Sequence, residues 1–521
     1  MKKTFFAKII CCILVLSLVL APSLSLGASA ADRTIARDCP QIDIPGFMAS
    51  EVLRDKTDPS KGEVFAYSVD DILNMLKEAL PTILPDFLIS NWDGVATKLI
   101  PVLEKFFDGM ILNPDGTANG NSGVVFTYPS PDRINKNSKL TFRYDWRLDP
   151  LESAAQLNDF INYVLECSGA EQVCLTCHSL GGVVTTSYVK LYGDEKIKSV
   201  VYNTTAVYGE TYTGELLSGK IVLNADAVEY YLRYLFDGND YELFLNGLMS
   251  ILNDLGILDA VCLLGNDLIE KLSPILLPKL VVPMFAGLPT IWDMVPDEYI
   301  DDAMEYVFGT VYADDDVDRS GLIEKIENYN TLVRADKTET LLKLQEDANM
   351  YVISRYVYSS IPVVPSYMSL TDSVIDTSRS SMGATTSEYR GVLTDEQLAE
   401  MDPKYVSPDN MVYAGTCLFP DQTWFIKNYP HSANSAIEDM MAALLYFDGQ
   451  ADVNTFEEYP QFMIFDRAED AVVPYTLDNA EPEKEVSFFD RILNFFNSFV
   501  SVILTIMQSV ADVVSGVKAE V

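Results

Sequence analysis

The sequence predicts an α/β fold, in which a mostly parallel sheet has flanking helices and contains a large helical cap insertion. Segments typical of strands and helices alternate at short intervals from 139 to 202, which favours a parallel sheet with crossover helices. A Leu-rich and mainly helical stretch follows from 210 to 348, and strand-like segments resume after it. We therefore expect residues 210–348 to form a cap on the sheet domain.

Local patterning defines the individual elements. Short apolar runs and alternating apolar and polar residues predict strands, whereas apolar residues at helical spacing predict helices. On this basis the expected strands are 41–44, 139–144, 172–176, 197–202, 350–358 and 423–427, and the expected crossover helices are 153–165 and 181–191.

The N-terminal segment has the features of an export signal. Lys2, Lys3 and Lys8 precede an apolar run over 9–20, and small residues at 28–30 provide a cleavage site. We therefore expect residues 1–30 to be removed and the mature protein to be secreted or held at the cell surface. The remaining chain divides into 31–209 and 349–448 as two parts of the sheet domain, 210–348 as the cap, 449–486 as a C-terminal extension and 487–521 as an apolar tail.

The charge balance limits the partners. The chain holds 76 acidic against 37 basic residues, a net charge of −39 at pH 7. Phosphate binding needs clustered Lys and Arg, so nucleic acid is excluded as a partner. The tail 487–521 mixes Phe, Ile and Val with Asn and Ser, which allows two interpretations: an amphipathic helix that packs on the body, or one that lies peripherally on a membrane.

Six cysteines follow the export signal, and the sequence leaves their redox state open. An exported chain could pair some of them in disulfides. Cys174 and Cys177 have the spacing of a zinc knuckle, but no second Cys-x-x-Cys or His pair accompanies them. Both lie on an expected buried strand, where Cys ordinarily serves as a small hydrophobe.

The strongest functional signal is the segment 173–183, where a strand runs into a sharp turn and then a helix. Such a turn lifts the hydroxyl of Ser179 above the sheet at a helix start, as in the nucleophile elbow of the α/β-hydrolase fold. The strained turn needs small residues on both sides of the serine. Gly181 meets this need, while Cys177 stands where glycine is usual. The Leu180 N–H would then point into an oxyanion hole.

A second oxyanion donor should follow an earlier strand. The Pro-Gly turn at 45–46 comes directly after the strand 41–44 and places Phe47 next. We expect the Phe47 N–H to be that donor, and the alternative is an ordinary Pro-Gly turn without a catalytic role.

The general base follows from histidine usage, because the chain has only two histidines. His178 adjoins Ser179, and its side chain cannot easily turn back to accept the serine proton. His431 lies in a loop after the strand 423–427, where a base is needed. We therefore expect His431 to be the base.

The acid of a Ser-His-Asp triad is expected between Ser179 and His431. Asp372 and Asp409 both lie in loops there, and we prefer Asp372 because it follows the earlier strand. Asp470 has similar surroundings but comes after His431, so it ranks third. For each of them a solvated loop carboxylate is the alternative.

Several motifs together resemble the lecithin:cholesterol acyltransferase-like group of α/β-hydrolases. They are FRYDWRLDP at 142–150, CHSLGG at 177–182 and PTIWDMVP at 289–296, with Pro-Gly at 45–46. The resemblance implies a lipase, phospholipase or acyltransferase with a lid over an acyl pocket. It also assigns Ser179 as nucleophile, His431 as base, and Phe47 and Leu180 as oxyanion donors. Cys177 departs from the family's glycine, and neither acid candidate has the family's Asp-Gly-Thr-Val in full.

One further segment resembles a calcium-binding loop. Residues 316–327 place oxygen-bearing side chains at EF-hand spacing, with a glycine at the sixth position. Calcium would then bind Asp316, Asp318, Ser320 and Glu327. The alternative is an acidic loop that caps the following helix.

The functional hypothesis is a secreted serine hydrolase that cleaves or transfers acyl groups of lipid-like esters without an organic cofactor. A different class remains open, namely a degenerate hydrolase scaffold that acts as a cell-surface binding module. The altered elbow at Cys177 favours the binding module. The retained Ser179 with a well-placed His431 favours the serine hydrolase.

Overall fold

The computed structural model describes residues 37–64, 75, 78–79, 81–86, 89–107, 109–236, 242–476 and 478–479. The expected export signal (1–30) and the expected tail (487–521) lie outside the described residues. Both histidines and the six cysteines that follow the export signal lie within them.

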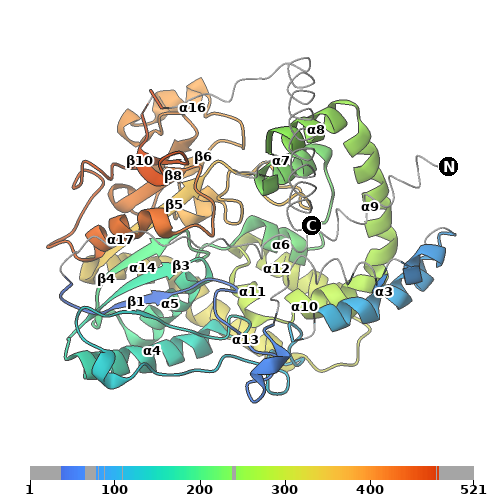
Figure 1. The fold of residues 1–521 in the computed structure, drawn as a ribbon, viewed down its shortest axis with the longest axis horizontal. Coiled ribbons are helices and arrows are strands. Elements are labelled where there is room, and N and C mark those ends of the chain that lie inside the picture. Colours follow the sequence, from blue (N-terminus) through green and yellow to red (C-terminus); the bar gives the residue numbers. More distant parts are fainter. Residues whose placement is uncertain are drawn as a thin grey trace, which may run out of the picture.

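One sheet forms the core of the left-hand part of the molecule in Figure 1. Its eight strands follow the order β10-β9-β8-β5-β4-β3-β1-β2, and every neighbouring pair is parallel except β9 with β10. This mostly parallel sheet with flanking helices confirms the predicted α/β class. The strands are β1 (Gln41–Ile44), β2 (Lys139–Thr141), β3 (Val173–His178), β4 (Ile197–Asn203), β5 (Asn349–Tyr356), β8 (Thr423–Lys427), β9 (Phe462–Asp466) and β10 (Ala471–Pro474), and a separate ribbon pairs β6 (Thr385–Thr386) with β7 (Val412–Tyr413).

The central strands are nearly continuous apolar runs, so their side chains are apolar on both faces of the sheet. Both faces must therefore be covered by helices to keep these side chains from water. In β3, Leu175 and Cys177 belong to the core on one face, and Cys174 belongs to the core on the other. On the first face α4 packs on α5, and α14 packs on α5 and β5, whereas α17 covers β3 and β4 on the second. The helices of the sheet domain are α3 (Trp92–Phe106), α4 (Pro150–Ser168), α5 (Leu180–Tyr192), α15 (Thr377–Ser380), α16 (Asp395–Glu400) and α17 (Glu438–Leu445).

Helix α4 illustrates how local chemistry sets the element bounds. The Asp149 carboxylate accepts the Leu151 N–H at 2.8 Å, and Pro150 occupies the first turn, where its missing N–H costs no hydrogen bond. Gly169 ends the helix in a left-handed conformation with φ 65°. These caps extend the helix beyond the 153–165 expected from apolar spacing.

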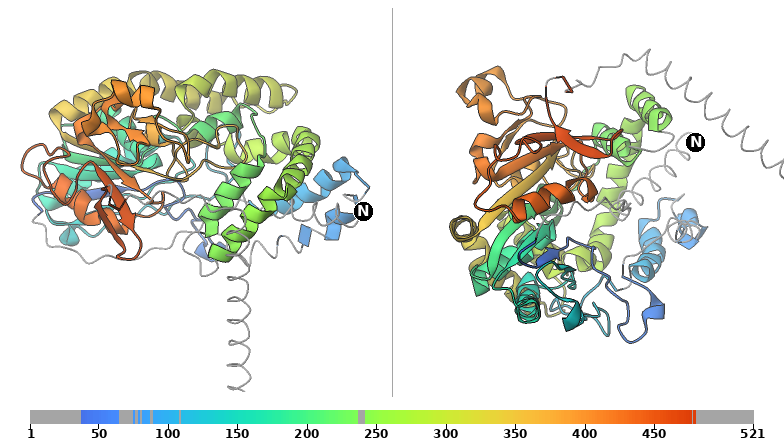
Figure 2. Two further views of the ribbon diagram at one scale, coloured as in Figure 1. Left: turned by 90° about the horizontal axis from the view of Figure 1, so that it is seen from above. Right: turned by 60° about the vertical axis from the view of Figure 1, so that its left-hand side comes forward.

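The segment between β4 and β5 is helical, as the cap prediction requires. Helices α7, α8 and α9 pack on one another and stand to one side of the sheet (Figures 1 and 2). Helix α3, from before β2, packs on α9, so this layer also uses a helix from the N-terminal part of the chain. The helices are α6 (Thr211–Leu217), α7 (Ala225–Phe236), α8 (Glu242–Asp254), α9 (Ile257–Leu276), α10 (Val282–Phe285), α11 (Pro289–Asp293), α12 (Ile300–Met304), α13 (Ser320–Leu332) and α14 (Lys337–Asp347), with π-helical turns at Leu277–Val281 and Glu305–Val311.

The junction of α8 and α9 carries exposed apolar side chains. Leu255, Ile257 and Leu263 expose large apolar side chains there. In the described part of the chain, no single helix is both long and apolar enough to cross a membrane. The segments Asn246–Asp254 and Ile257–Lys279 meet that test only as a pair, which bends by 80°.

The C-terminal extension 449–486 contributes to the sheet, a feature that the sequence analysis missed. Strand β9 pairs in parallel with β8, with Phe462 opposite Phe425, and the rings of these two residues stack at a centroid distance of 5.5 Å. The hairpin from β9 to β10 then forms the antiparallel edge. The extension is therefore part of the sheet domain as far as residue 474.

Candidate active site

Ser179 lies in a strained turn between β3 and α5. Its backbone has φ 55° and ψ −124°, a conformation that non-glycine residues rarely adopt and that is frequent at functional sites. A Cβ at Gly181 would lie 2.2 Å from the Ile44 carbonyl oxygen, so only glycine fits two residues after the serine. The sharp turn predicted from the sequence is therefore present, with Ser179 buried at 4% exposure.

Cys177, the residue that departs from the usual elbow sequence, does not reach the turn with its side chain. Its thiol is fully buried and donates to the Val201 carbonyl oxygen at 3.5 Å. Burial raises the pKa of this thiol well above its ordinary range. Cys177 is thus a core residue of the elbow strand, and its neutral sulfur is no competing nucleophile.

The loop after β1 lies directly against Ser179. A Cβ at Gly46 would lie 2.8 Å from the Ser179 Cβ and 3.2 Å from Nδ1 of His178. This contact places the next residue, Phe47, beside the elbow. Leu180 is the first residue of α5, and the N–H groups of a first helical turn have no acceptor within the helix. The two predicted oxyanion donors therefore lie on segments that meet at Ser179.

The Tyr-Asp-Trp-Arg motif at 144–147 supports this loop. The Tyr144 hydroxyl donates to the Pro45 carbonyl oxygen at 2.7 Å, and Trp146 Nε1 donates to the Ser50 carbonyl oxygen at 3.1 Å. The Trp146 ring also contacts the Phe47 ring edge-on at a centroid distance of 4.5 Å. The motif thus fixes the position of the loop that carries Phe47.

The motif is itself held by a buried ion pair. Arg147 is fully buried, and its guanidinium binds both oxygens of Asp145, at 2.9 and 2.7 Å. It also donates to the Gly109 carbonyl oxygen and to the Ser122 hydroxyl. The charge-assisted bonds of this pair anchor Asp145 and Arg147, the residues on either side of Trp146, and so limit the movement of Trp146.

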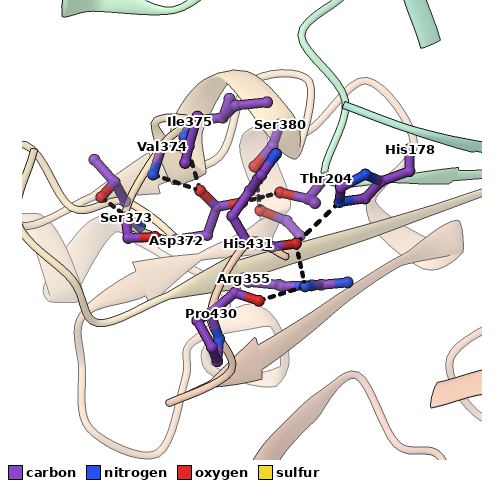
Figure 3. Close-up of polar contacts among 12 residues, drawn as sticks. His178, Thr204, Arg355, Asp372, Ser373, Val374, Ile375, Ser380, Pro430 and His431 are labelled. Carbon is purple, nitrogen blue, oxygen red and sulfur yellow. Dashed lines mark hydrogen bonds and ion pairs between the residues drawn. The ribbon is translucent and has the colours of Figure 1, made fainter. Parts of the chain in front are cut away.

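His431 and Asp372 form a close pair (Figure 3). His431 Nδ1 lies 2.7 Å from Asp372 Oδ2, and the His431 N–H donates to the Asp372 carbonyl oxygen at 2.9 Å. The Thr204 hydroxyl donates to the same Oδ2. The other carboxylate oxygen accepts the N–H groups of Val374 and Ile375, at 3.0 and 2.7 Å.

This environment keeps Asp372 ionised although it is fully buried. Burial alone would raise the pKa of Asp372, but the adjacent His431 imidazole and the surrounding hydrogen-bond donors hold that pKa below its ordinary value. An ionised acceptor at Nδ1 keeps the proton on that nitrogen, which leaves Nε2 of His431 free to accept one.

The backbone of His431 is anchored by a buried arginine that the sequence analysis missed. Arg355, on β5, donates to the carbonyl oxygens of Pro430 and His431 at 2.6 and 2.8 Å (Figure 3). Its second terminal nitrogen donates to the side-chain oxygens of Asn203 and Asn434, at 3.0 and 2.7 Å.

Arg355 is fully buried, and these four acceptors are neutral. Burial lowers its pKa from the ordinary value. The guanidinium also lies over the Tyr429 ring at 4.6 Å from the centroid, which stabilises the cation in place of a carboxylate partner. Nothing in the sequence distinguishes this arginine from a surface residue, since its role depends on contacts with residues 75 and more positions away.

Two links join the Ser179 turn to the His431–Asp372 pair. His178 Nε2 lies 2.9 Å from the His431 carbonyl oxygen, and the two imidazole rings are 4.7 Å apart between centroids. After β4, the Ala206 N–H donates to the Ser179 carbonyl oxygen at 3.2 Å, two residues beyond the Thr204 that contacts Asp372. The three predicted residues therefore gather where β3, β4, β5 and β8 end.

His178 is itself held neutral at this position. Burial lowers the pKa of His178 well below its ordinary value, and the neighbouring His431 and Arg355 lower it further. It thus donates to the His431 backbone without adding charge.

The other two acid candidates lie elsewhere. Asp409 pairs with Lys427 at 3.0 Å and accepts from the Ser407 hydroxyl at 2.6 Å. Asp470 is exposed in the turn between β9 and β10. Of the three carboxylates, the structure places Asp372 against His431.

The predicted calcium loop is not assembled. Helix α13 begins at Ser320, so the residues from Ser320 to Glu327 follow a helix and do not wrap around an ion. The Asp318 carboxylate accepts the N–H of Ser320, the first residue of α13, at 3.0 Å, while the N-cap position itself is held by Arg319. Among the described residues, no group of three or more His, Cys, Asp or Glu side chains is arranged to hold a metal ion.

One buried acid near the pair also escaped prediction. Glu210 begins the cap at the N-terminus of α6, is 3% exposed and accepts the Thr213 hydroxyl at 2.8 Å. Burial raises the pKa of Glu210 to about 7, while Thr213 and the nearby His431 partly offset this rise. Its isolated position after a strand carries no sequence signal.

Comparisons with known proteins agree with the sequence motifs over part of the chain. The model of the lecithin:cholesterol acyltransferase family matches residues 134–222, which include the Tyr-Asp-Trp-Arg motif and Ser179. No curated protein sequence matches. A solved structure, the crystal structure of the Tle4-Tli4 complex, has 16% sequence identity and a TM-score of 0.19, and the match spans 34% of this chain and about half (48%) of that one. This structural likeness is too slight to bear on fold or function.

Proposed function

We propose that this protein is a serine hydrolase that cleaves or transfers acyl groups of lipid-like esters. The observation that carries the proposal is the Asp372–His431 pair, which lies beside the strained turn of Ser179. A neutral imidazole with an ionised carboxylate behind it is the general base that a serine nucleophile requires. The family match over residues 134–222 supports acyl chemistry at this serine.

The reaction proceeds through an acyl-enzyme. Ser179 Oγ attacks the ester carbonyl carbon while Nε2 of His431 takes the serine proton, and Asp372 stabilises the resulting imidazolium. The amides of Phe47 and Leu180 bind the oxyanion. Collapse of the tetrahedral intermediate releases the alcohol, which takes its proton from His431. Water or a second alcohol then removes the acyl group by the reverse sequence.

The substrate class is proposed from the cap. Helices α7 to α9 contribute a small apolar core of their own, including Val228, Leu232 and Leu258, beside the sheet domain. The cap also exposes the large apolar side chains of Leu255, Ile257 and Leu263, and such a surface suits a long acyl chain better than a polar ester. Export by residues 1–30 and peripheral membrane contact by the tail 487–521 belong to the same proposal.

The experiment is hydrolysis of p-nitrophenyl esters from short to long acyl chains by the mature protein and by Ser179→Ala. We expect a burst of p-nitrophenol that is lost in Ser179→Ala, with a rate that rises with chain length. A burst unaffected by the substitution would place the nucleophile elsewhere. Adding a soluble alcohol then separates hydrolysis from transfer, because a transferase forms the new ester at the expense of free acid.

The binding-module alternative is based on two departures, Cys177 at the elbow and the incomplete acid motif. The Cys177 side chain lies in the core with the turn intact, so the first departure does not favour this alternative. A protein that binds lipid but neither hydrolyses esters nor reacts with a fluorophosphonate would restore this alternative.

A further inference from the structure

Two cysteines from distant parts of the chain meet at the N-terminal ends of β1 and β3. Cys39 precedes β1 by two residues, and Cys174 lies within β3, opposite Gln41 in the parallel register. The Cys174 N–H donates to the Pro40 carbonyl oxygen at 2.8 Å, which fixes the two backbones side by side. The two Sγ atoms are 2.9 Å apart although the residues are 135 positions apart in sequence.

The surroundings of the pair are closed and ordered. Cys39 is 4% exposed and Cys174 is fully buried, and both belong to the core beneath α17. The Ser199 hydroxyl contacts the Cys174 sulfur at 3.2 Å and donates to the Leu445 carbonyl oxygen at 2.6 Å. The Tyr446 hydroxyl donates to the Cys39 carbonyl oxygen at 3.3 Å. The two sulfur atoms therefore have little room to separate.

We propose that Cys39 and Cys174 form a disulfide bond in the mature protein. A disulfide places its sulfur atoms about 2.05 Å apart, so closure requires a movement of less than about 1 Å. The chain carries the features of an export signal, and exported proteins fold where disulfides persist. Among the described cysteines, no other pair of sulfur atoms is in contact.

The oxidation is a thiol–disulfide exchange with a dithiol oxidant of the export compartment. During folding, before the pair is buried, one thiolate attacks the oxidant's disulfide and forms a mixed disulfide, and the other thiolate then displaces the oxidant. Two thiols of this chain lose two protons and two electrons, and the oxidant becomes a dithiol.

The bond would join the two strands that lead to the proposed active site. Strand β1 runs into the loop that carries Phe47, and β3 runs into Ser179. A covalent link at their other ends would hold the register in which Ile44 lies opposite Cys177. The disulfide rests on the proposed export of the chain but not on the proposed ester chemistry, because it requires only the two thiols and an oxidant.

The test is peptide mapping of the full mature protein, refolded in a mixture of oxidised and reduced glutathione. Free thiols are blocked with iodoacetamide under denaturing conditions, with and without prior reduction, and proteolytic peptides are assigned by mass. We expect a linked pair of peptides containing Cys39 and Cys174 that separates on reduction, with two additional alkylated thiols. Because the pair is buried, a mild reductant should leave the disulfide of the native protein intact. The same reductant should cleave it once the protein is denatured.

Variants give a second readout. We expect Cys39→Ser and Cys174→Ser to lower the Tm by several degrees under oxidising conditions, and the reduced wild-type protein to show a similar fall. Cys262→Ser, a matched control in the cap, should keep the linked peptide. The proposal would be overturned if Cys39 and Cys174 were both alkylated without prior reduction, or if either were linked to another cysteine. The peptide mapping gives this answer even if the serine variants do not fold.

Discussion

The substitution Asp372→Asn tests the acid–base pair with little disturbance of the fold. One carboxylate oxygen accepts the N–H groups of Val374 and Ile375, and the side-chain oxygen of asparagine can keep both bonds. The amide nitrogen would then face His431 Nδ1 and Thr204, where it can only donate. Donation to Nδ1 forces the proton of the imidazole onto Nε2, which can no longer accept the serine proton.

The magnitude follows from this change of tautomer. Loss of the base through the wrong tautomer lowers kcat about 10⁴-fold in a Ser-His-Asp triad. At about 1.36 kcal/mol for each factor of ten, the lost transition-state stabilisation is about 5.4 kcal/mol. Loss of the charged acceptor also removes a charge-assisted bond, which we expect to cost about 2 kcal/mol of folding stability.

The assay is steady-state hydrolysis of a p-nitrophenyl ester, with circular dichroism to establish that the variant is folded. Asp409→Asn is the matched control, because Asp409 contacts Lys427 and Ser407 rather than His431. We expect the control to retain activity within about tenfold of the wild type, because the ion-pair and hydrogen-bond partners of Asp409 do not include Ser179, Asp372 or His431. A folded Asp372→Asn with near wild-type kcat, or a larger loss in Asp409→Asn, would refute the reasoning.

The same geometry sets the expected outcome of substitutions at Gly46, Arg355 and Glu210. Gly46→Ala adds a Cβ 2.8 Å from that of Ser179, so the oxyanion loop must shift, and kcat should fall about 10²-fold while the protein stays folded; unchanged kcat would contradict this placement. Arg355→Met removes the donors to the His431 carbonyl and should lower kcat about 10²-fold with a smaller change in KM, whereas Arg355→Lys should recover part of it; equal activity of all three proteins would exclude a positioning role. Burial raises the pKa of Glu210 to about 7 from an ordinary 4.5, so folding stability should fall as the pH rises between these values. Glu210→Gln should flatten that part of a profile of Tm against pH. An identical profile in the variant would show that Glu210 does not titrate in this range.

The sequence predicted those parts of the fold that depend on local patterning. The strands 41–44 and 423–427 have the predicted bounds, because each is a short run that ends at a turn or loop. Strand β3 and the Ser179 turn also follow from local sequence, since strand, sharp turn and helix are contiguous. The family motifs at 142–150 and 177–182 lie within the segment that the family model matches.

The remaining features depend on contacts that sequence spacing does not record. Asp372 and Asp409 have equivalent local sequences, and only the path of the loop after β5 brings one of them to His431. Strands β9 and β10 lie in a segment that the motifs did not cover, and their pairing partner is β8. Arginine is ordinarily a surface residue. Arg355 is buried where acceptors at the ends of two other strands, His431 and Asn203, meet its guanidinium.

The predicted calcium loop shows the opposite error. Residues 316–327 match the spacing of oxygen ligands, but spacing does not decide whether the segment is a loop or a helix. Because α13 begins at Ser320, the last ligand position lies two turns along a helix from the first residue of that helix. A linear match of this kind therefore has no meaning without the conformation that it assumes.

The central claim is that Ser179 is the nucleophile, and covalent labelling tests it most directly. The mature protein is incubated with a fluorophosphonate, and the modified residue is identified by peptide mass, with Ser179→Ala and His431→Ala as comparisons. We expect one label per chain on Ser179, none in Ser179→Ala, and a much slower reaction in His431→Ala. A label on another residue, or none on the folded wild-type protein, would contradict it.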